Sequence, residues 1–73
     1  MPIDEILKLI RKELNISQER LARELNVSFA TMNRWENKKS NPSRMAIIQI
    51  KEYCGKNGLP KEIMSELEKY RKT

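Results

Sequence analysis

Residues 17–35 read SQERLARELNVSFATMNRW, a pattern typical of two short helices joined by a turn. Ser17 and Ser28 each stand just before a helical pattern, where a serine hydroxyl can accept a hydrogen bond from a free backbone N–H group. We therefore predict helices over residues 18–25 and 29–37, with these two serines as their N-caps. Residues 24–27 make the turn between the helices, and Asn26 is the residue there that best tolerates a positive φ.

Apolar side chains recur within this stretch at a spacing that places them on one side of each helix. Residues three and four positions apart share a helix face, so we expect these side chains to pack together in a core. Ala22 is small where the two helices must cross closely, and Trp35 is expected to be a core residue. The residues with this inward spacing are Leu21, Ala22, Leu25, Val27, Met32 and Trp35.

With those side chains buried, the second helix of the pair presents a different set outward. Those outward residues are Phe29, Ala30, Asn33 and Arg34. Asn can make paired hydrogen bonds to adenine and Arg to guanine in the major groove, and apolar side chains can contact thymine methyl groups. The alternatives are that Asn33 and Arg34 are solvated polar residues and that Phe29 folds back onto its own domain. We predict that this face reads DNA bases.

The residues that follow form a polar, basic loop. Between Arg34 and Arg44 there are four cations and one anion, Glu36, which gives a net charge of +3 over eleven residues. Cations and amide donors beside a reading helix are suited to phosphate contact, although a pair of loop lysines taken alone is usually only solvated. Gln18, at the free N–H groups that start the first helix of the pair, is a further candidate phosphate ligand. The predicted phosphate-binding residues are Ser28, Thr31, Asn37, Lys38, Lys39, Ser40 and Arg44.

Three further helices are predicted around this pair. Residues 2–14 carry one apolar stripe, begin with Pro2 at the first helical position and end at Asn15, which tolerates the left-handed conformation of a helix stop. Two more helices should run from Pro42 or Ser43 to about residue 55 and over residues 60–72. Their inward positions are Ile3, Ile6, Leu7, Ile10 and Leu14, then Ala46, Ile47, Ile50, Tyr53 and Cys54, and finally Ile63, Leu67 and Tyr70. No stretch alternates with period two, so we predict an all-α fold.

Length and composition limit the possible classes of protein. A chain of 73 residues is enough for a single domain over residues 1–73, with a modest core. The formal net charge of +5 favours an anionic partner. No apolar run approaches the length needed to span a bilayer and no signal peptide is evident, so we expect a cytoplasmic protein with no membrane partner.

The scarcity of reactive side chains argues against catalysis. The sequence has no histidine and a single cysteine, Cys54, so it lacks the commonest general base, the usual ligands of a zinc site and an intrachain disulfide. Cys54 is expected to be a small buried hydrophobe. We predict a protein that is not an enzyme and needs no cofactor.

Two segments, ISQERLARELNVS at residues 16–28 and TMNRWENKKSNPS at residues 31–43, resemble the Xre family of Cro and phage-repressor type helix-turn-helix regulators. The resemblance extends over about residues 6–53. The chain departs from the family pattern in the turn, where the family usually has glycine and this chain has Asn26. The positions that match the family pattern are Gln18, Ala22, Val27, Met32, Trp35 and Glu36.

The resemblance implies a five-helix, lambda-repressor-like domain with its helix-turn-helix at the second and third helices. It implies binding to a two-fold symmetric double-stranded DNA operator, commonly as a homodimer, with the third helix in the major groove and most often to repress transcription. It assigns base reading to Gln18 together with Phe29, Ala30, Asn33 and Arg34. It also implies an ion pair between Arg11 and Glu36, with Arg11 near a phosphate.

Two other functions are compatible with the sequence. The domain could be a protein-interaction module of the same fold, or an antitoxin that binds both DNA and a toxin. Four side chains could extend beyond the core, either because burial is incomplete in so small a domain or because the last helix forms a dimer contact. These side chains are Met45, Ile48, Met64 and Tyr70.

Overall fold

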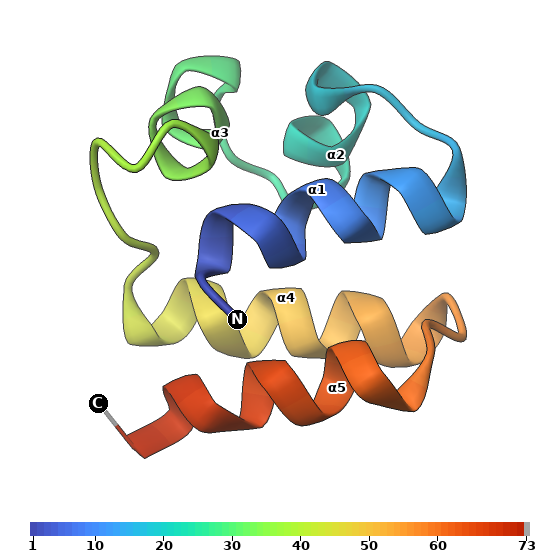
Figure 1. The fold of residues 1–73 in the computed structure, drawn as a ribbon. Helices are drawn as coiled ribbons and strands as arrows, with labels where there is room; N and C mark the ends of the chain where they lie inside the picture. Colours follow the sequence, from blue (N-terminus) through green and yellow to red (C-terminus); the bar gives the residue numbers. More distant parts are fainter. Residues whose placement is uncertain (73) are drawn as a thin grey trace.

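The computed structural model describes residues 1–72 of the chain, and the side chains of residues 1–70. Within that range it consists of helices alone, as predicted. The elements are α1 (Ile3–Leu14), α2 (Gln18–Glu24), α3 (Phe29–Glu36), α4 (Arg44–Lys56), α5 (Lys61–Glu68) and a 3₁₀ turn, η1 (Lys69–Lys72). α1 lies between the α2–α3 pair and the antiparallel α4–α5 pair, and it packs against both α3 and α5 (Figure 1). None of the described helices is both long enough and apolar enough to cross a bilayer.

The helix starts follow the predicted serine caps closely. The Ser17 hydroxyl oxygen accepts a 3.0 Å hydrogen bond from the Arg20 N–H, and the Ser28 oxygen accepts one of the same length from Thr31. Pro2 was predicted as the first helical residue, and this is wrong: it is the N-cap of α1, with an extended ψ of 151°. A proline ring fixes φ but leaves ψ free, so it can precede a helix as readily as start one.

Several helix ends differ by one residue or more from the prediction. α2 and α3 each end one residue early, with Leu25 and Asn37 as C-caps, and α4 begins at Arg44 and continues to Lys56. The last predicted helix ends at Glu68 and tightens into η1. Helix ends commonly tighten or fray in this way, because the last carbonyl groups have no partner within the helix.

Left-handed backbone conformations occur where the turns require them. Asn15 has φ 56° and Asn26 has φ 62°, which confirms both predictions. Lys38 also has a φ of 62°, which the sequence analysis did not predict. It comes directly after Asn37, the C-cap of α3, and the Lys39 N–H bonds to the Arg34 carbonyl oxygen at 2.9 Å, so one left-handed residue ends the helix. This places the basic loop directly beside α3.

One hydrophobic core joins the helices. The predicted inward residues are buried except Leu14, Val27, Tyr53 and Tyr70, which are half-buried against it. Leu59 lies between α4 and α5 and was not among the predicted core residues, yet it is buried. Its N–H donates to the Cys54 carbonyl oxygen at 3.1 Å, which folds the chain back onto α4. Cys54 is fully buried, and burial raises the pKa of its thiol to about 11.

Candidate nucleic-acid interface

The two sides of α3 are in opposite environments. Met32 is fully buried and Trp35 nearly so, and both belong to the core as predicted. On the other side Phe29 is 52% exposed, and Ala30 and Arg34 are also exposed. Phe29 therefore does not fold back onto its own domain.

Three amide side chains connect α2 to α3 across the predicted reading face. The Asn33 Nδ2 donates a 3.2 Å hydrogen bond to Oε1 of Gln18, and the Asn37 Nδ2 donates a 2.9 Å bond to Oδ1 of Asn33. Asn33 is half-buried, which distinguishes it from its exposed neighbours on α3. An amide group has two N–H donors and two acceptor lone pairs, so each side chain keeps hydrogen-bonding capacity for another partner. We refer to Gln18, Asn33 and Asn37 as the amide chain.

The amide chain was not predicted from the sequence. The four-residue spacing of Asn33 and Asn37 was a usable signal, because side chains four apart are neighbours on a helix. The link to Gln18 depends on how α2 crosses α3, and no local spacing reports that crossing.

Hydroxyl groups order the first turn of α3. The Ser28 Oγ donates to Oγ1 of Thr31 at 2.9 Å while accepting the Thr31 backbone N–H, and Nη2 of Arg34 reaches the same Oγ1 at 3.5 Å. The structure thus brings two predicted phosphate ligands beside Arg34, a predicted base-reading residue. Their positions at a helix N-terminus suit an anion.

A buried ion pair ties α1 to the end of α3. The Arg11 Nε and Nη2 donate to the two carboxylate oxygens of Glu36 at 3.0 and 2.7 Å, which confirms the pair that the family resemblance implied. Glu36 is only 3% exposed, whereas the Arg11 side chain is 27% exposed. A bidentate pair fixes both distance and orientation, so it holds the far end of α3 against α1. Phosphate contact by Arg11 stays a prediction.

The basic loop after α3 is open to solvent. Lys38 and Lys39 are exposed, and Ser40 is half-buried. In the part of the chain that the structure describes, neither lysine ammonium has an ion-pair partner. Both charges are therefore available to an anion.

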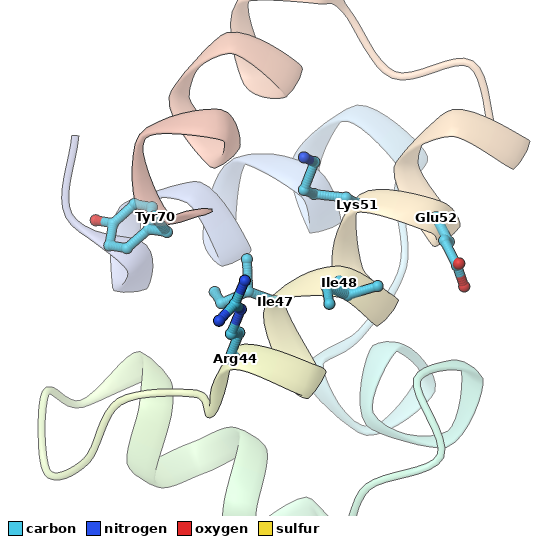
Figure 2. A pocket seen from close by; sticks show the side chains of 6 residues that line it. All are labelled: Arg44, Ile47, Ile48, Lys51, Glu52 and Tyr70. Carbon is cyan, nitrogen blue, oxygen red and sulfur yellow. The ribbon is translucent and has the colours of Figure 1, made fainter. Parts of the chain in front are cut away.

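Arg44 is the first residue of α4. Its side chain runs beside Ile47 toward Tyr70 and lines a groove on α4, as Figure 2 shows. A phosphate contact by Arg44 stays a prediction.

A hydrogen bond connects α2 to α4. The Tyr53 hydroxyl donates to Oε1 of Glu24 at 2.6 Å, and Nε of Arg20 donates to its other oxygen at 3.1 Å. The Tyr53 bond is the main reason why the Glu24 pKa is lowered, with the Arg20 bond second. Burial, and then this same bond, raise the Tyr53 pKa to about 12, so its proton stays in place as the donor across neutral pH.

A buried carboxylate in α1 was also missed by the sequence analysis. Asp4 lies in the first turn of α1 and is only 4% exposed. Its Oδ2 lies 3.9 Å from Nζ of Lys8, one turn along the helix. The four-residue spacing of these opposite charges was the available signal.

Comparison with known families agrees with this geometry. A family model described as helix-turn-helix matches residues 7–59, most of the chain, and this range contains α2, α3 and the basic loop. Comparisons with curated proteins and with solved structures returned no match. With its five helices and its α2–α3 pair, the chain belongs to the helix-turn-helix family of DNA-binding regulators, of the Cro and phage-repressor type.

Proposed function

We propose that this domain binds double-stranded DNA at a specific sequence, inserts α3 into the major groove and represses transcription. One observation carries the proposal: α3 is buried along its Met32–Trp35 side, while its other side combines exposed Phe29 and Arg34 with an oriented amide chain. A reading helix needs such rigid support, because base contacts depend on placing donors and acceptors accurately against base edges.

Each outward residue has a matching base chemistry. Arg34 is suited to the two acceptors of guanine, and Phe29 and Ala30 to thymine methyl groups. Asn33 is suited to adenine, and its bonds to Gln18 and Asn37 limit its rotation before DNA arrives. A preorganised side chain loses less rotational freedom on binding, so the amide chain supports affinity as well as specificity.

Phosphate contacts on both sides of α3 would fix the register of the domain on DNA. We assign the phosphate contacts to the exposed ammonium groups of Lys38 and Lys39, to neighbouring polar side chains and to the backbone N–H groups at helix N-termini. The complete proposed set is Arg11, Ser28, Thr31, Asn37, Lys38, Lys39, Ser40 and Arg44. Repression follows from occupancy alone, since a domain bound over a promoter excludes other proteins from it.

Selection of bound duplexes from a random DNA pool tests this function. We expect an enriched site made of two inverted half-sites, and we expect Arg34→Ala to lose the preference at one base position in each half. The loss should be about 1–3 kcal/mol for each bidentate contact removed. Sequence preference that Arg34→Ala leaves unchanged would show that the reading face is assigned wrongly. If the pool yields no enriched site while the domain forms a stable complex with another protein, the interaction-module alternative is favoured.

A further inference from the structure

A pocket opens where α1 begins and the basic loop leaves α3. It has a volume of about 310 Å³ and is lined by the first residues of α1, by Trp35 of α3, by Lys38 and Asn41 of the loop and by Tyr70 of η1. These elements come from both ends and the middle of the chain, and they meet on one side of the fold (Figure 1). The volume is at the low end of the range for small-molecule sites. We refer to this cavity as the loop pocket.

The negative group of the loop pocket is the carboxylate of Asp4. Its side chain, taken by itself, is only 6% exposed, yet within the described part of the chain neither oxygen accepts a hydrogen bond. The ion pair with Nζ of Lys8 spans 3.9 Å, which is beyond hydrogen-bond distance, and the Lys8 side chain is 53% exposed. A buried carboxylate without donors is unfavourable, because it has lost water and gained no replacement. A ligand that brings N–H donors into the pocket relieves this.

The loop pocket also has an aromatic and apolar wall. Trp35 is 6% exposed, and among the residues that the structure describes its indole N–H has no hydrogen-bond partner. A buried indole N–H usually donates to a partner, so Trp35 retains an unused donor. Ile3 and Tyr70 also line the pocket. Such a wall suits a short carbon chain, and aromatic rings attract an ammonium group.

The cation of the loop pocket is Lys38. It is exposed, its backbone is left-handed with φ 62°, and over residues 1–70 its ammonium group has no ion-pair partner. Asn41 is also exposed and adds an amide group with two N–H donors. One pocket thus contains a buried anion that lacks donors and an exposed cation that lacks an anion, and Asp4 and Lys38 do not pair with each other.

We propose that the loop pocket binds a small amino acid in its zwitterionic form. The ligand's ammonium group donates to Asp4, and its carboxylate is held by the Lys38 ammonium and the Asn41 amide. Its carbon chain lies against Ile3 and Trp35. A simple amine would leave the lysine unpaired, and a simple carboxylate would be repelled by the aspartate. A zwitterion satisfies both charges of the pocket and adds no net charge to it.

The bound amino acid has a consequence for DNA binding, and this consequence rests on the proposed function. Lys38 is one of the proposed phosphate ligands, so its ammonium group would be shared between the amino acid's carboxylate and a DNA phosphate. Two ligands that compete for one group lower each other's affinity by the same factor. We expect the amino acid to weaken binding to the selected duplex about fivefold or more.

Fluorescence of Trp35, the single tryptophan of the chain, reports ligand binding from the wall of the pocket. The full chain without DNA is titrated with glycine, β-alanine, γ-aminobutyrate and ε-aminocaproate, in which the separation of ammonium and carboxylate increases stepwise. Each is compared with the alkylamine and the carboxylate of the same chain length, which carry one charge. We expect a saturable change in the millimolar range or below for the zwitterion of matching length, and binding about tenfold weaker or more for its two single-charge analogues.

Two variants test the assigned contacts with the same titration. Asp4→Asn keeps the shape of the side chain and removes its charge. Lys38→Asn removes the ammonium group and introduces a residue that tolerates the left-handed backbone. Each should raise the dissociation constant of the amino acid about tenfold or more, because each removes a hydrogen bond to a charged group. Glu5→Gln and Lys12→Asn make the same changes in charge at exposed positions of α1 and should leave that constant unchanged.

Circular dichroism of each variant establishes that it is folded, and if Asp4→Asn does not fold, Lys38→Asn decides alone. The proposal is overturned if no zwitterion gives a saturable response, if a single-charge analogue binds as tightly, or if the folded variants bind like their controls. Because this titration contains no DNA, it can succeed while the DNA proposal fails, and the reverse. A ligand that binds but leaves the affinity for the selected duplex unchanged supports the pocket and overturns its coupling to DNA.

Discussion

At the turn between α2 and α3, the backbone of Asn26 is left-handed, with φ 62°. In this conformation an L-residue's Cβ crowds the following carbonyl oxygen, and asparagine tolerates the crowding better than most residues because its short polar side chain can bond locally. The turn keeps the N–H of Val27 bonded to the Ala22 carbonyl oxygen at 2.9 Å, which sets how α3 leaves α2. A single residue thus influences the orientation of the whole α3 face.

We expect Asn26→Ala to lower the free energy of unfolding by about 1 kcal/mol, because alanine has the Cβ without the compensating polar group. Asn26→Gly should change it by about 0.5 kcal/mol or less, since glycine adopts this φ without strain but loses more entropy on folding. Urea unfolding followed by circular dichroism measures both. Equal stability of the two variants would mean that the left-handed turn imposes no strain.

The Arg11–Glu36 pair is the second feature that acts at the scale of single residues. Removing the arginine leaves a carboxylate that is 3% exposed without its partner. We expect Arg11→Ala to destabilise the domain by about 3 kcal/mol, the low end of the range for a broken buried pair, because Arg11 is itself partly exposed. Lys12→Ala, next in sequence and exposed, should cost about 0.5 kcal/mol or less. A loss in Arg11→Ala no larger than that in Lys12→Ala would contradict a structural role for the pair.

At the scale of elements, α2 is held from two sides. Its inner face packs on α3 through the core, and its last turn is tied to α4 by the bond from Tyr53 to Glu24. This bond connects α2 to α4, while α3 is joined to the start of α4 by the basic loop. The helix starts themselves depend on local serine caps, which need no tertiary contact.

The hydrogen bond from Tyr53 to Glu24 makes the stability of the fold depend on pH in the acidic range. The folded-state pKa of Glu24 is lowered, so its contribution to stability is present above its ordinary pKa of 4.5 and is lost as the pH falls through the lower, folded value. Tyr53→Phe removes the main cause of the shift, so we expect the Glu24 pKa to rise toward 4.5 and stability to depend less on pH in that acidic range. NMR titration of the carboxylate checks this. Tyr70→Phe makes the same chemical change on η1, where the hydroxyl donates to the Met1 carbonyl oxygen, and should leave the Glu24 pKa unaltered.

For the whole molecule, the uneven distribution of charge is the important property. The chain carries a net +5, and the segment from Arg34 to Arg44 alone contributes +3. Each phosphate that a cation neutralises releases condensed counterions, so binding should weaken with added salt.

We expect the slope of log K against log salt to become shallower by about 1 in Lys39→Ala, with weaker binding to all DNA sequences alike. Lys61→Ala removes an exposed charge at the start of α5, away from the basic loop, and should leave the slope as it is. Binding constants at several salt concentrations, on both selected and random duplexes, measure the effect. If the two variants have the same slope, Lys39 makes no phosphate contact.

The positions of the helices could be predicted from the sequence because their signals are local. Ser17 and Ser28 cap the turns that follow them, Asn15 and Asn26 stop helices, and apolar spacing identifies Met32 and Trp35 as core. Family resemblance added the Arg11–Glu36 pair, which joins residues far apart in the chain and has no local signal. Helix ends were less accurate, as at α5, because the final turns depend on what packs against them.

Sequence by itself therefore determined the all-α class, the α2–α3 pair and the face of α3 that points away from the core, since periodicity and capping act within a few residues. Only the tertiary structure decided that Gln18 meets Asn33, that Tyr53 bonds to Glu24 and that Arg44 lies along the α4 groove. Those contacts depend on the angles and distances at which helices cross, and these are set by the packing of the entire core rather than by any single segment.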